Sequence, residues 1–117
     1  MAVRVRRLMV RSDFLKVKLG RRASTQSFVV QYLDVEAEDG LAVGFTASTK
    51  GVGNAVARNR ARRRLKAVFD EVCRLNPDAA GQGKWLVLVA KAPILEIDYK
   101  YLVKDMRKAL TEAGITC

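Results

Sequence analysis

The sequence predicts an α+β fold in which helices pack against one β-sheet, within a single domain spanning residues 1–117. The chain has 117 residues, half of them hydrophobic, which is enough to bury one core. Segments typical of strands alternate with segments typical of helices along the chain. Such alternation favours one sheet covered by helices, because each element has to bury an apolar face against another.

The first half of the chain predicts one helix and two strands. Ser12 is placed to cap a short helix that carries Phe14 and Val17 on one side and ends at Gly20. The β-branched and aromatic residues at 26–35 indicate a strand. A second strand, expected at 41–47, follows an acidic turn and should run antiparallel to the first.

The second half predicts a long helix, a buried strand and a last helix. Residues 54–75 form the long helix, which Pro77 stops. Residues 85–90 are a continuous apolar run, as expected for a strand buried on both faces. Asp98 is placed to cap the last helix, whose apolar stripe is Leu102, Met106, Ala109, Leu110 and Ala113. The expected order is α-β-β-α-β-α, with room for one more short strand.

Positive charge is concentrated in the long helix. Six of the nine residues from Arg58 to Lys66 are cationic and none is acidic, and the whole chain has a net charge of +10. Like charges on adjacent helical turns repel one another, so an external polyanion is expected to neutralise them. Nucleic acid is the first candidate, an anionic membrane surface the second and a merely solvated surface the third.

Helical periodicity separates a core face of this helix from its charges. At about 100° per residue, the core face spans about 120° and consists of Ala57, Ala61, Leu65, Val68, Phe69 and Val72. The rest of the surface carries Asn59, Arg60, Arg62, Arg63, Arg64 and Lys66. Arg58 lies at the border, where its stem can pack while its guanidinium reaches outward. The helix can therefore dock on a sheet and still present its cations.

Several classes of function are excluded or disfavoured by composition. The chain has no histidine, which removes the commonest general base and metal ligand. Cys73 and Cys117 are too few and too isolated for a disulfide framework or a structural zinc site. No secretory signal or membrane-spanning run is present, so we expect a cytoplasmic protein.

Two further features leave alternatives open. Gly51 and Gly53 precede the basic helix, and free amides at its N-terminus either hold a phosphate or simply belong to a turn. Phe28, Val30 and Tyr32 share one face of their strand. They either stack on unpaired bases or pack in the core.

The segment from Gly53 to Lys66 contains Gly-Asn-Ala-Val-Ala-Arg-Asn-Arg followed by further cations. It strongly resembles the signature of the bacterial ribonuclease P protein subunit. Asp13-Phe14, Gly20 and Ala90-Lys91 also fall where that family has similar residues, so the resemblance covers nearly the whole chain. It implies an α/β sandwich of order α-β-β-β-α-β-α, like domain 2 of ribosomal protein S5, with a left-handed βαβ crossover.

The resemblance also implies a function in which the protein is not the catalyst. An RNA subunit, using Mg²⁺, hydrolyses precursor tRNA to leave the mature 5′ end, and the protein carries neither a catalytic nor a metal-binding residue. Its partners are ribonuclease P RNA and precursor tRNA, with no membrane and no small-molecule substrate. The implied RNA-binding residues are Lys50, Asn54, Arg58, Asn59, Arg60, Arg62, Arg63, Arg64 and Lys66. The implied cleft for the single-stranded 5′ leader comprises Phe14, Lys18, Phe28, Val30 and Lys91.

Some positions depart from the family pattern. Lys18 replaces a second cleft aromatic, Gly51 replaces a usual lysine, and Gln31 stands where a tyrosine is frequent. Tyr32 comes one position later, which should turn it to the opposite face of the strand. Leader binding is therefore expected to depend less on stacking and more on charge.

Two other functions compete with this interpretation. A structural RNA-binding protein, for example of the ribosome, would carry the same basic helix. A stand-alone nuclease would need clustered carboxylates to bind a metal, and Asp34, Glu36, Glu38 and Asp39 are clustered in the sequence. These acids lie at a strand end and a turn, where acidic residues are common without any catalytic role.

Overall fold

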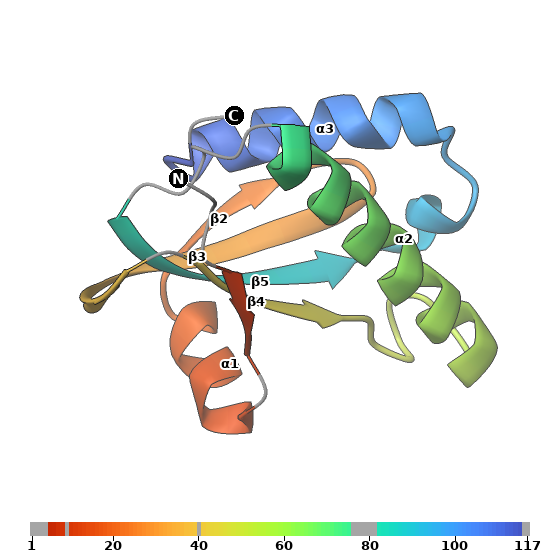
Figure 1. Cartoon of the computed structure of the whole chain (residues 1–117). Coiled ribbons are helices and arrows are strands. Elements are labelled where there is room, and N and C mark those ends of the chain that lie inside the picture. The colour runs from red at the N-terminus through yellow and green to blue at the C-terminus, as the bar shows by residue number, and fades with distance from the viewer. Residues whose placement is uncertain (1–4, 9, 40, 76–81, 116–117) are drawn as a thin grey trace.

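A five-stranded sheet carries helices on both of its faces (Figure 1). The computed structural model describes residues 5–8, 10–39, 41–75 and 82–115. Its elements are β1 (Val5–Arg7), α1 (Arg11–Lys18), β2 (Arg21–Ser24), β3 (Phe28–Asp39), β4 (Leu41–Thr46), α2 (Ala55–Leu75), β5 (Gln82–Ala90), the 3-10 helix η1 (Ala92–Leu95) and α3 (Tyr99–Glu112).

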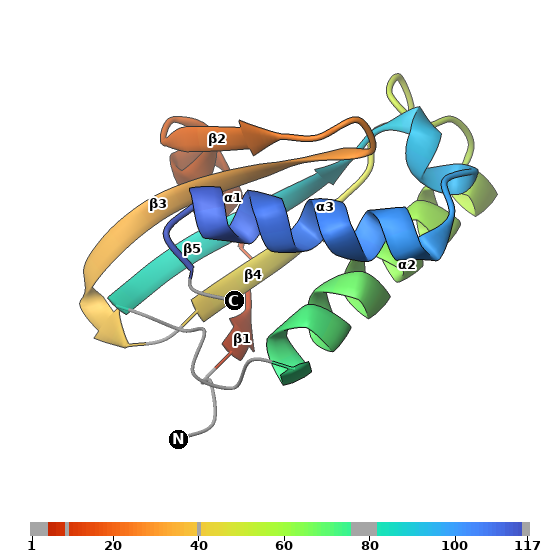
Figure 2. The same cartoon turned by 90° about the horizontal axis from the view of Figure 1, so that it is seen from above.

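The sheet is mixed, and its strand order is β1-β4-β5-β3-β2. β4 runs parallel to both β1 and β5, whereas β3 runs antiparallel to both β5 and β2. The connection from β4 through α2 to β5 is left-handed (Figure 2), as the family resemblance implies and against the usual preference for right-handed crossovers. The S5-like classification is consistent with this arrangement.

The main core lies between the sheet and the two helices α2 and α3. Residues of α2 such as Leu65 and Phe69 pack there with Phe28 of β3 and Leu88 of β5. A smaller apolar cluster lies on the opposite face, where Val17 of α1 packs against Val87 of β5. β5 is therefore covered on both faces, which confirms the interpretation of its continuous apolar run.

The predicted order α-β-β-β-α-β-α is confirmed, and the short β1 precedes it. β2 is the extra strand that the resemblance supplied and that the residue pattern alone left open. The predicted Ser12 cap is wrong, because α1 begins at Arg11 and Val10 occupies the N-cap position without a side-chain hydrogen bond. The predicted stop at Pro77 and the centre of the turn at Gly40 lie outside the described residues.

The two strands predicted at 26–35 and 41–47 are antiparallel in direction, but they do not pair. β5 lies between β3 and β4 and forms hydrogen bonds with both. The acidic segment expected as a turn belongs to β3, which continues to Asp39. The sequence pattern located both strands but not the end of the first one or its pairing, because a third strand with a stronger apolar character takes the central position.

The apolar stripe of α3 is confirmed. Leu102, Met106, Ala109, Leu110 and Ala113 are all buried. Asp98 occupies the N-cap position with extended backbone, but its side chain makes no capping hydrogen bond. The outer face of α3 is thus directed away from the sheet and left to polar residues.

Candidate nucleic-acid interface

A tight loop presents the N-terminus of the basic helix α2. The Ser48 hydroxyl accepts a hydrogen bond from the Gly51 amide at 2.8 Å, and the Ser48 carbonyl accepts one from Val52 at 2.9 Å. Gly53 has φ +129°, a backbone conformation that residues with a side chain rarely adopt. The loop is therefore held by its own contacts and leaves Lys50 exposed at its tip.

Asn54 caps α2. Its side-chain Oδ1 accepts a hydrogen bond from the Ala57 amide at 2.9 Å, and its carbonyl accepts one from Arg58. The amides of Gly51, Val52, Ala57 and Arg58 are thus already engaged within the protein. This favours the turn interpretation of the glycines over a phosphate cradle built on these amides, and it gives Asn54 a structural role in addition to the predicted contact with RNA.

The outer face of α2 presents the cations that the helical periodicity assigns to it. Asn59, Arg60, Arg63 and Lys66 are exposed. Lys66 pairs with Asp70 at 3.3 Å, with about half of each side chain exposed, so an incoming phosphate can compete for it. Arg60 and Arg63 make no hydrogen bond or ion pair within the described part of the chain, which leaves both guanidiniums available.

Arg62 and Arg58 are partly occupied within the protein. The half-buried Arg62 donates a hydrogen bond to the Asn59 side chain. Arg58 is half-buried at the border of the core face, as predicted, and its buried Nε has no hydrogen-bond partner among the described residues. An unsatisfied donor on a charged group is costly, so the Arg58 guanidinium would gain from an external acceptor.

Arg64 has a structural role that the sequence did not predict. Its guanidinium donates to the carbonyl of Ile94 in η1 and, at 2.7 Å, to the carbonyl of Ile97. These two hydrogen bonds join the middle of α2 to the segment that leads into α3. Periodicity placed Arg64 on the surface, but η1 folds back against that flank of the helix. The planar guanidinium of Arg64 can donate to two backbone carbonyls at once, and these hydrogen bonds hold α2 against η1.

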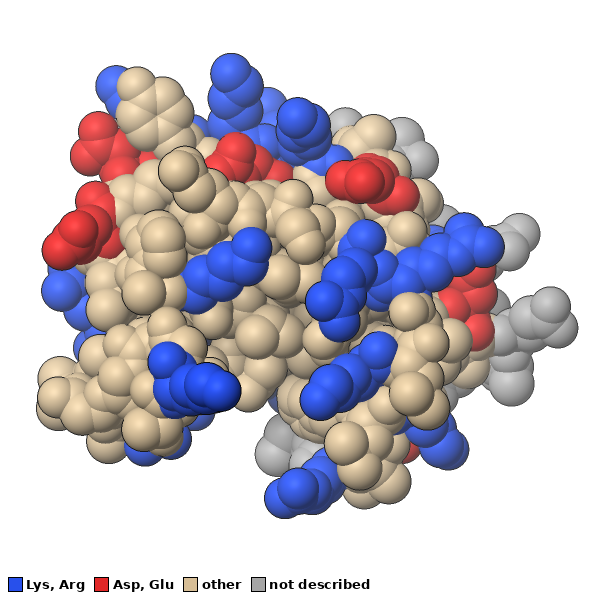
Figure 3. Space-filling model, turned by 180° about the vertical axis from the view of Figure 1, so that it is seen from behind, with Lys and Arg blue, Asp and Glu red and all other residues tan. Residues whose placement is uncertain are grey.

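A groove lies beside α1, on the sheet face opposite to α2 and α3. Phe14 is half-buried there, and it packs so closely on β4 that a methyl group at Gly44 would lie 2.5 Å from its Cζ. Phe14 packs against the smaller apolar cluster, as do three other half-buried residues, Leu33, Trp85 and Val89. Figure 3 shows this side of the molecule hollowed between two lobes, with Lys and Arg side chains on both. Lys18, at the end of α1, is exposed.

Two predicted cleft residues are corrected by the structure. Phe28 and Val30 have no exposed surface and lie in the main core beneath α2 and α3, so neither can contact a leader. Both face away from α1, because β3 alternates and its other face is the one that α1 approaches. Core packing, the alternative left open by the sequence, is correct for these two residues.

The register of β3 shows which of its residues lie on the groove side. Gln31 pairs with Val87, which packs against α1, so Gln31 shares the face of Phe14. Tyr32 faces the opposite side and packs against the main core, as the predicted one-residue slip requires. Val29 and Val89, two half-buried residues on the groove side, were not among the predicted cleft residues. Counting parity from Gln31 would have found Val29.

Lys91 has an internal partner. Its Nζ donates to the carbonyl of Thr25 at 2.7 Å, and its amide donates to the carbonyl of Ser27. It therefore ties the end of β5 to the turn between β2 and β3. Any contact of Lys91 with a leader would have to compete with that hydrogen bond.

The described residues contain no group of three or more His, Cys, Asp or Glu residues placed to hold a metal ion. The side chains of Glu36, Glu38 and Asp39 lie outside what the structure describes, as do those of Cys73 and Cys117. None of the helices in the described ranges combines the length and the hydrophobicity that crossing a bilayer requires.

Comparison with known proteins agrees with the family resemblance. The family model described as Ribonuclease P matches residues 3–114. The ribonuclease P protein component of Gluconacetobacter diazotrophicus is 40% identical over 116 residues, covering 98% of this chain and 97% of that protein. The one from Ruegeria pomeroyi is 43% identical over 107 residues, covering 88% of this chain and 82% of that protein.

Two solved structures have the same fold. The Staphylococcus aureus RNase P protein matches with a TM-score of 0.76 at 21% identity, covering 95% of this chain and 97% of that chain. The RNase P protein from Thermotoga maritima matches with a TM-score of 0.68 at 23% identity, covering 91% and 96%. At these identities, the likeness establishes the architecture of the sheet and helices.

Proposed function

This chain belongs to the ribonuclease P protein family, and from that membership we propose that it acts as a single RNA-binding domain with two RNA contacts. The outer face of α2 binds the catalytic RNA subunit, and the groove beside α1 binds the 5′ leader of precursor tRNA. Family membership itself makes the chain the protein part of an endoribonuclease that processes the 5′ ends of tRNA.

The observation that carries the RNA contact is the set of unpaired cations around the start of α2. Lys50, Arg60 and Arg63 are exposed and have no partner among the residues that the structure describes, while the helix that bears two of them is fixed by its buried face and by Arg64. A rigid helix that displays charge loses little conformational freedom on binding. Three phosphate contacts would give a salt dependence of about 2 to 3 logarithmic units per logarithmic unit of salt.

The groove supports a weaker contact, selective for single-stranded RNA. Phe14 offers a half-exposed aromatic ring, and Lys18 offers an exposed cation at the same end of the molecule. Stacking of one base on an aromatic ring contributes about 1–3 kcal/mol. Gln31 and Val29 lie on the same face of β3 and supply one polar and one apolar contact surface, so stacking on Phe14 and contact with cations are proposed to hold the leader.

The chain's own residues bind and orient RNA, and the hydrolytic chemistry belongs to the RNA subunit. Mg²⁺ is proposed to act there, held by RNA phosphates, and no side chain of this protein is assigned to it. By lowering the repulsion between two polyanions, the cations of α2 reduce the Mg²⁺ concentration needed to bring them together. The reaction is proposed to take place in the cytoplasm.

The leader contact can be tested by comparing precursor tRNA with mature tRNA. The holoenzyme is assembled from bacterial ribonuclease P RNA and either the natural chain or Phe14→Ala, and the dissociation constants of both tRNAs are measured. We expect Phe14→Ala to weaken precursor binding about 5- to 150-fold, as loss of one stack implies, and to leave mature tRNA unchanged. Leu15→Ala is the matched control, since Leu15 is the neighbouring residue of α1 and is 52% exposed.

Equal losses for precursor and mature tRNA would contradict the leader contact. A ribosomal role predicts a different result, namely that ribosomal RNA copurifies with the chain from cells and that precursor tRNA binding is unaffected by Phe14→Ala. Sequencing the copurified RNA separates the two functions.

A further inference from the structure

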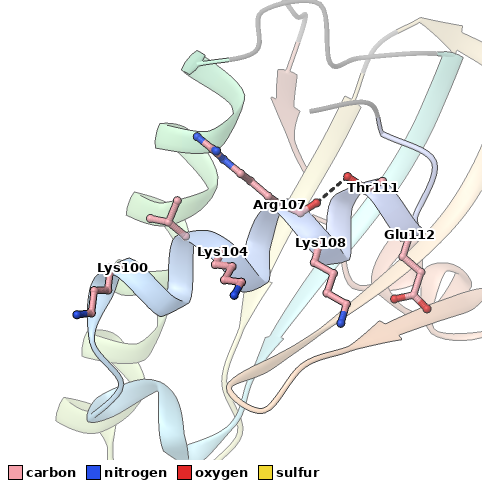
Figure 4. Close-up of a pocket in the computed structure, with 7 residues that line it drawn as sticks. Lys100, Lys104, Arg107, Lys108, Thr111 and Glu112 are labelled. Atoms are coloured by element: carbon pink, nitrogen blue, oxygen red, sulfur yellow. Dashed lines mark hydrogen bonds between the residues drawn. The ribbon is translucent and has the colours of Figure 1, made fainter.

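The outer face of α3 carries a second set of cations, separate from those of α2. The set, called here the α3 stripe, consists of Lys100, Lys104, Arg107 and Lys108, all exposed (Figure 4). At about 100° per residue, the four side chains fall within a sector of about 100°. Thr111 shares that sector, whereas Asp105 and Glu112 lie to one side of it.

No acidic side chain in the described part of the protein forms an ion pair with the α3 stripe. None of its four cations takes part in a hydrogen bond or ion pair through its side chain in the described ranges. Lys100 alone has a charge-related contact, at 5.1 Å from the centre of the Tyr101 ring. Lys100, Lys104 and Lys108 follow one another at i,i+4 spacing, at which like charges repel.

Helix stability does not explain this arrangement. Cations stabilise a helix near its C-terminus and destabilise it near its N-terminus, because of the helix dipole. Lys100 stands in the first turn of α3, a turn without any acidic residue, and Lys104 follows in the N-terminal half. An external anion would compensate for both the repulsion and the unfavourable position.

The chemistry of the α3 stripe favours RNA over a membrane. A membrane-surface helix inserts an apolar face, but the apolar face of α3 is the stripe of Leu102, Met106 and Leu110, which is wholly buried in the core. Apart from the exposed rings of Tyr99 and Tyr101, the outer face presents a row of cations about 12 Å long from Lys100 to Lys108, at 1.5 Å per residue. Such a row can follow successive phosphates of an RNA backbone.

We propose that the α3 stripe binds the phosphate backbone of an RNA segment different from the one in the groove beside α1. α3 covers one face of the sheet and α1 the other, so one short RNA strand cannot occupy both surfaces (Figure 1). The α3 stripe goes beyond the proposed function, because it adds a third RNA surface to the two contacts assigned above.

The test measures binding of the full chain to a labelled 12-nucleotide oligouridine RNA over a range of salt concentrations. Lys104→Gln with Lys108→Gln removes two charges from the α3 stripe, and Lys104→Arg with Lys108→Arg is the matched control that keeps them. The same pairs are also made in a chain carrying Arg60→Gln and Arg63→Gln, which weakens the α2 surface. Thermal unfolding followed by circular dichroism checks that every variant is folded.

We expect the glutamine pair to reduce the slope of log K against log salt by about 1.4, and to do so in both backgrounds, because two phosphate contacts are lost. The arginine pair should keep the slope. An unchanged slope with the glutamine pair in both backgrounds would overturn the proposal. So would a glutamine pair that abolishes binding to phosphatidylserine vesicles while RNA binding is unaffected.

The outcomes for the two surfaces are distinguishable. If the α2 surface does not bind RNA, Arg60→Gln with Arg63→Gln should leave the slope of log K against log salt unchanged, and the proposed function fails. If the α3 stripe does not bind RNA, only Lys104→Gln with Lys108→Gln should leave that slope unchanged, and the proposed function stands.

Discussion

Replacing Arg64 separates a structural arginine from its RNA-binding neighbours. The guanidinium of Arg64 makes two hydrogen bonds, to the carbonyls of Ile94 and Ile97, in a partly buried setting. Hydrogen bonds to a charged group contribute about 1.5–3 kcal/mol each, and partial exposure reduces that value. We therefore expect Arg64→Ala to lower the free energy of unfolding by about 2–3 kcal/mol.

The assay is equilibrium unfolding in urea, with Arg63→Ala as the matched control. Arg63 is the adjacent residue and is exposed, with no partner in the described part of the chain, so its loss should change stability by less than about 0.5 kcal/mol. Arg64→Lys should recover about half of the loss, because an ammonium can reach one carbonyl but cannot span two. RNA binding should show the reverse order, with Arg63→Ala lowering the salt slope and Arg64→Ala leaving it unchanged wherever the variant is folded. Equal stability of Arg64→Ala and Arg63→Ala would refute the reasoning.

Three further changes test the fold and its charges. Phe28→Ala should lower the free energy of unfolding by about 3–5 kcal/mol, because it leaves a cavity at a fully buried site. A loss below about 1 kcal/mol in urea unfolding would contradict the burial of Phe28. Gly53→Ala should lower the free energy of unfolding by about 1–3 kcal/mol, because φ is +129° at this position. An unchanged midpoint of thermal unfolding, followed by circular dichroism, would contradict this. The Lys84 ammonium, through its hydrogen bond, holds the pKa of Asp34 below its usual value, so its folded-state pKa lies below the unfolded one. The small stabilisation that Asp34→Asn removes should thus be present at pH 7 and disappear as the pH falls below about 4; a stability difference that grows towards low pH would contradict this sign.

Much of the fold follows from periodicity in the sequence. Burial confirms the stripe of α3, and it confirms the core face of α2 except at Ala57, which is half-buried, because an apolar sector on a helix has to be covered. Strand pairing was harder to predict, since nothing local to 26–47 shows that β5 separates its two strands. The left-handed crossover came only from the family resemblance.

The sequence predicted some residues of the candidate site correctly and others not, depending on whether their environment is local or formed by distant segments. Arg60 and Arg63 are exposed as expected, because their positions depend on helix geometry alone. Arg64 depends on where η1 folds back, and that contact joins residues about 30 positions apart. Phe28 shows a different limit. Strand parity places it with Val30 on one face, but parity alone does not say which face a helix covers.

The central claim is that this chain assists an RNA enzyme through the cations displayed on α2. The most direct measurement is the rate of precursor tRNA cleavage by bacterial ribonuclease P RNA at low Mg²⁺, with increasing amounts of RNA-free protein. We predict that the natural chain stimulates cleavage, that Arg60→Gln with Arg63→Gln requires more protein or more Mg²⁺ for the same rate, and that the protein alone cleaves nothing. The absence of stimulation at every protein concentration, or cleavage by the protein without RNA, would contradict the claim.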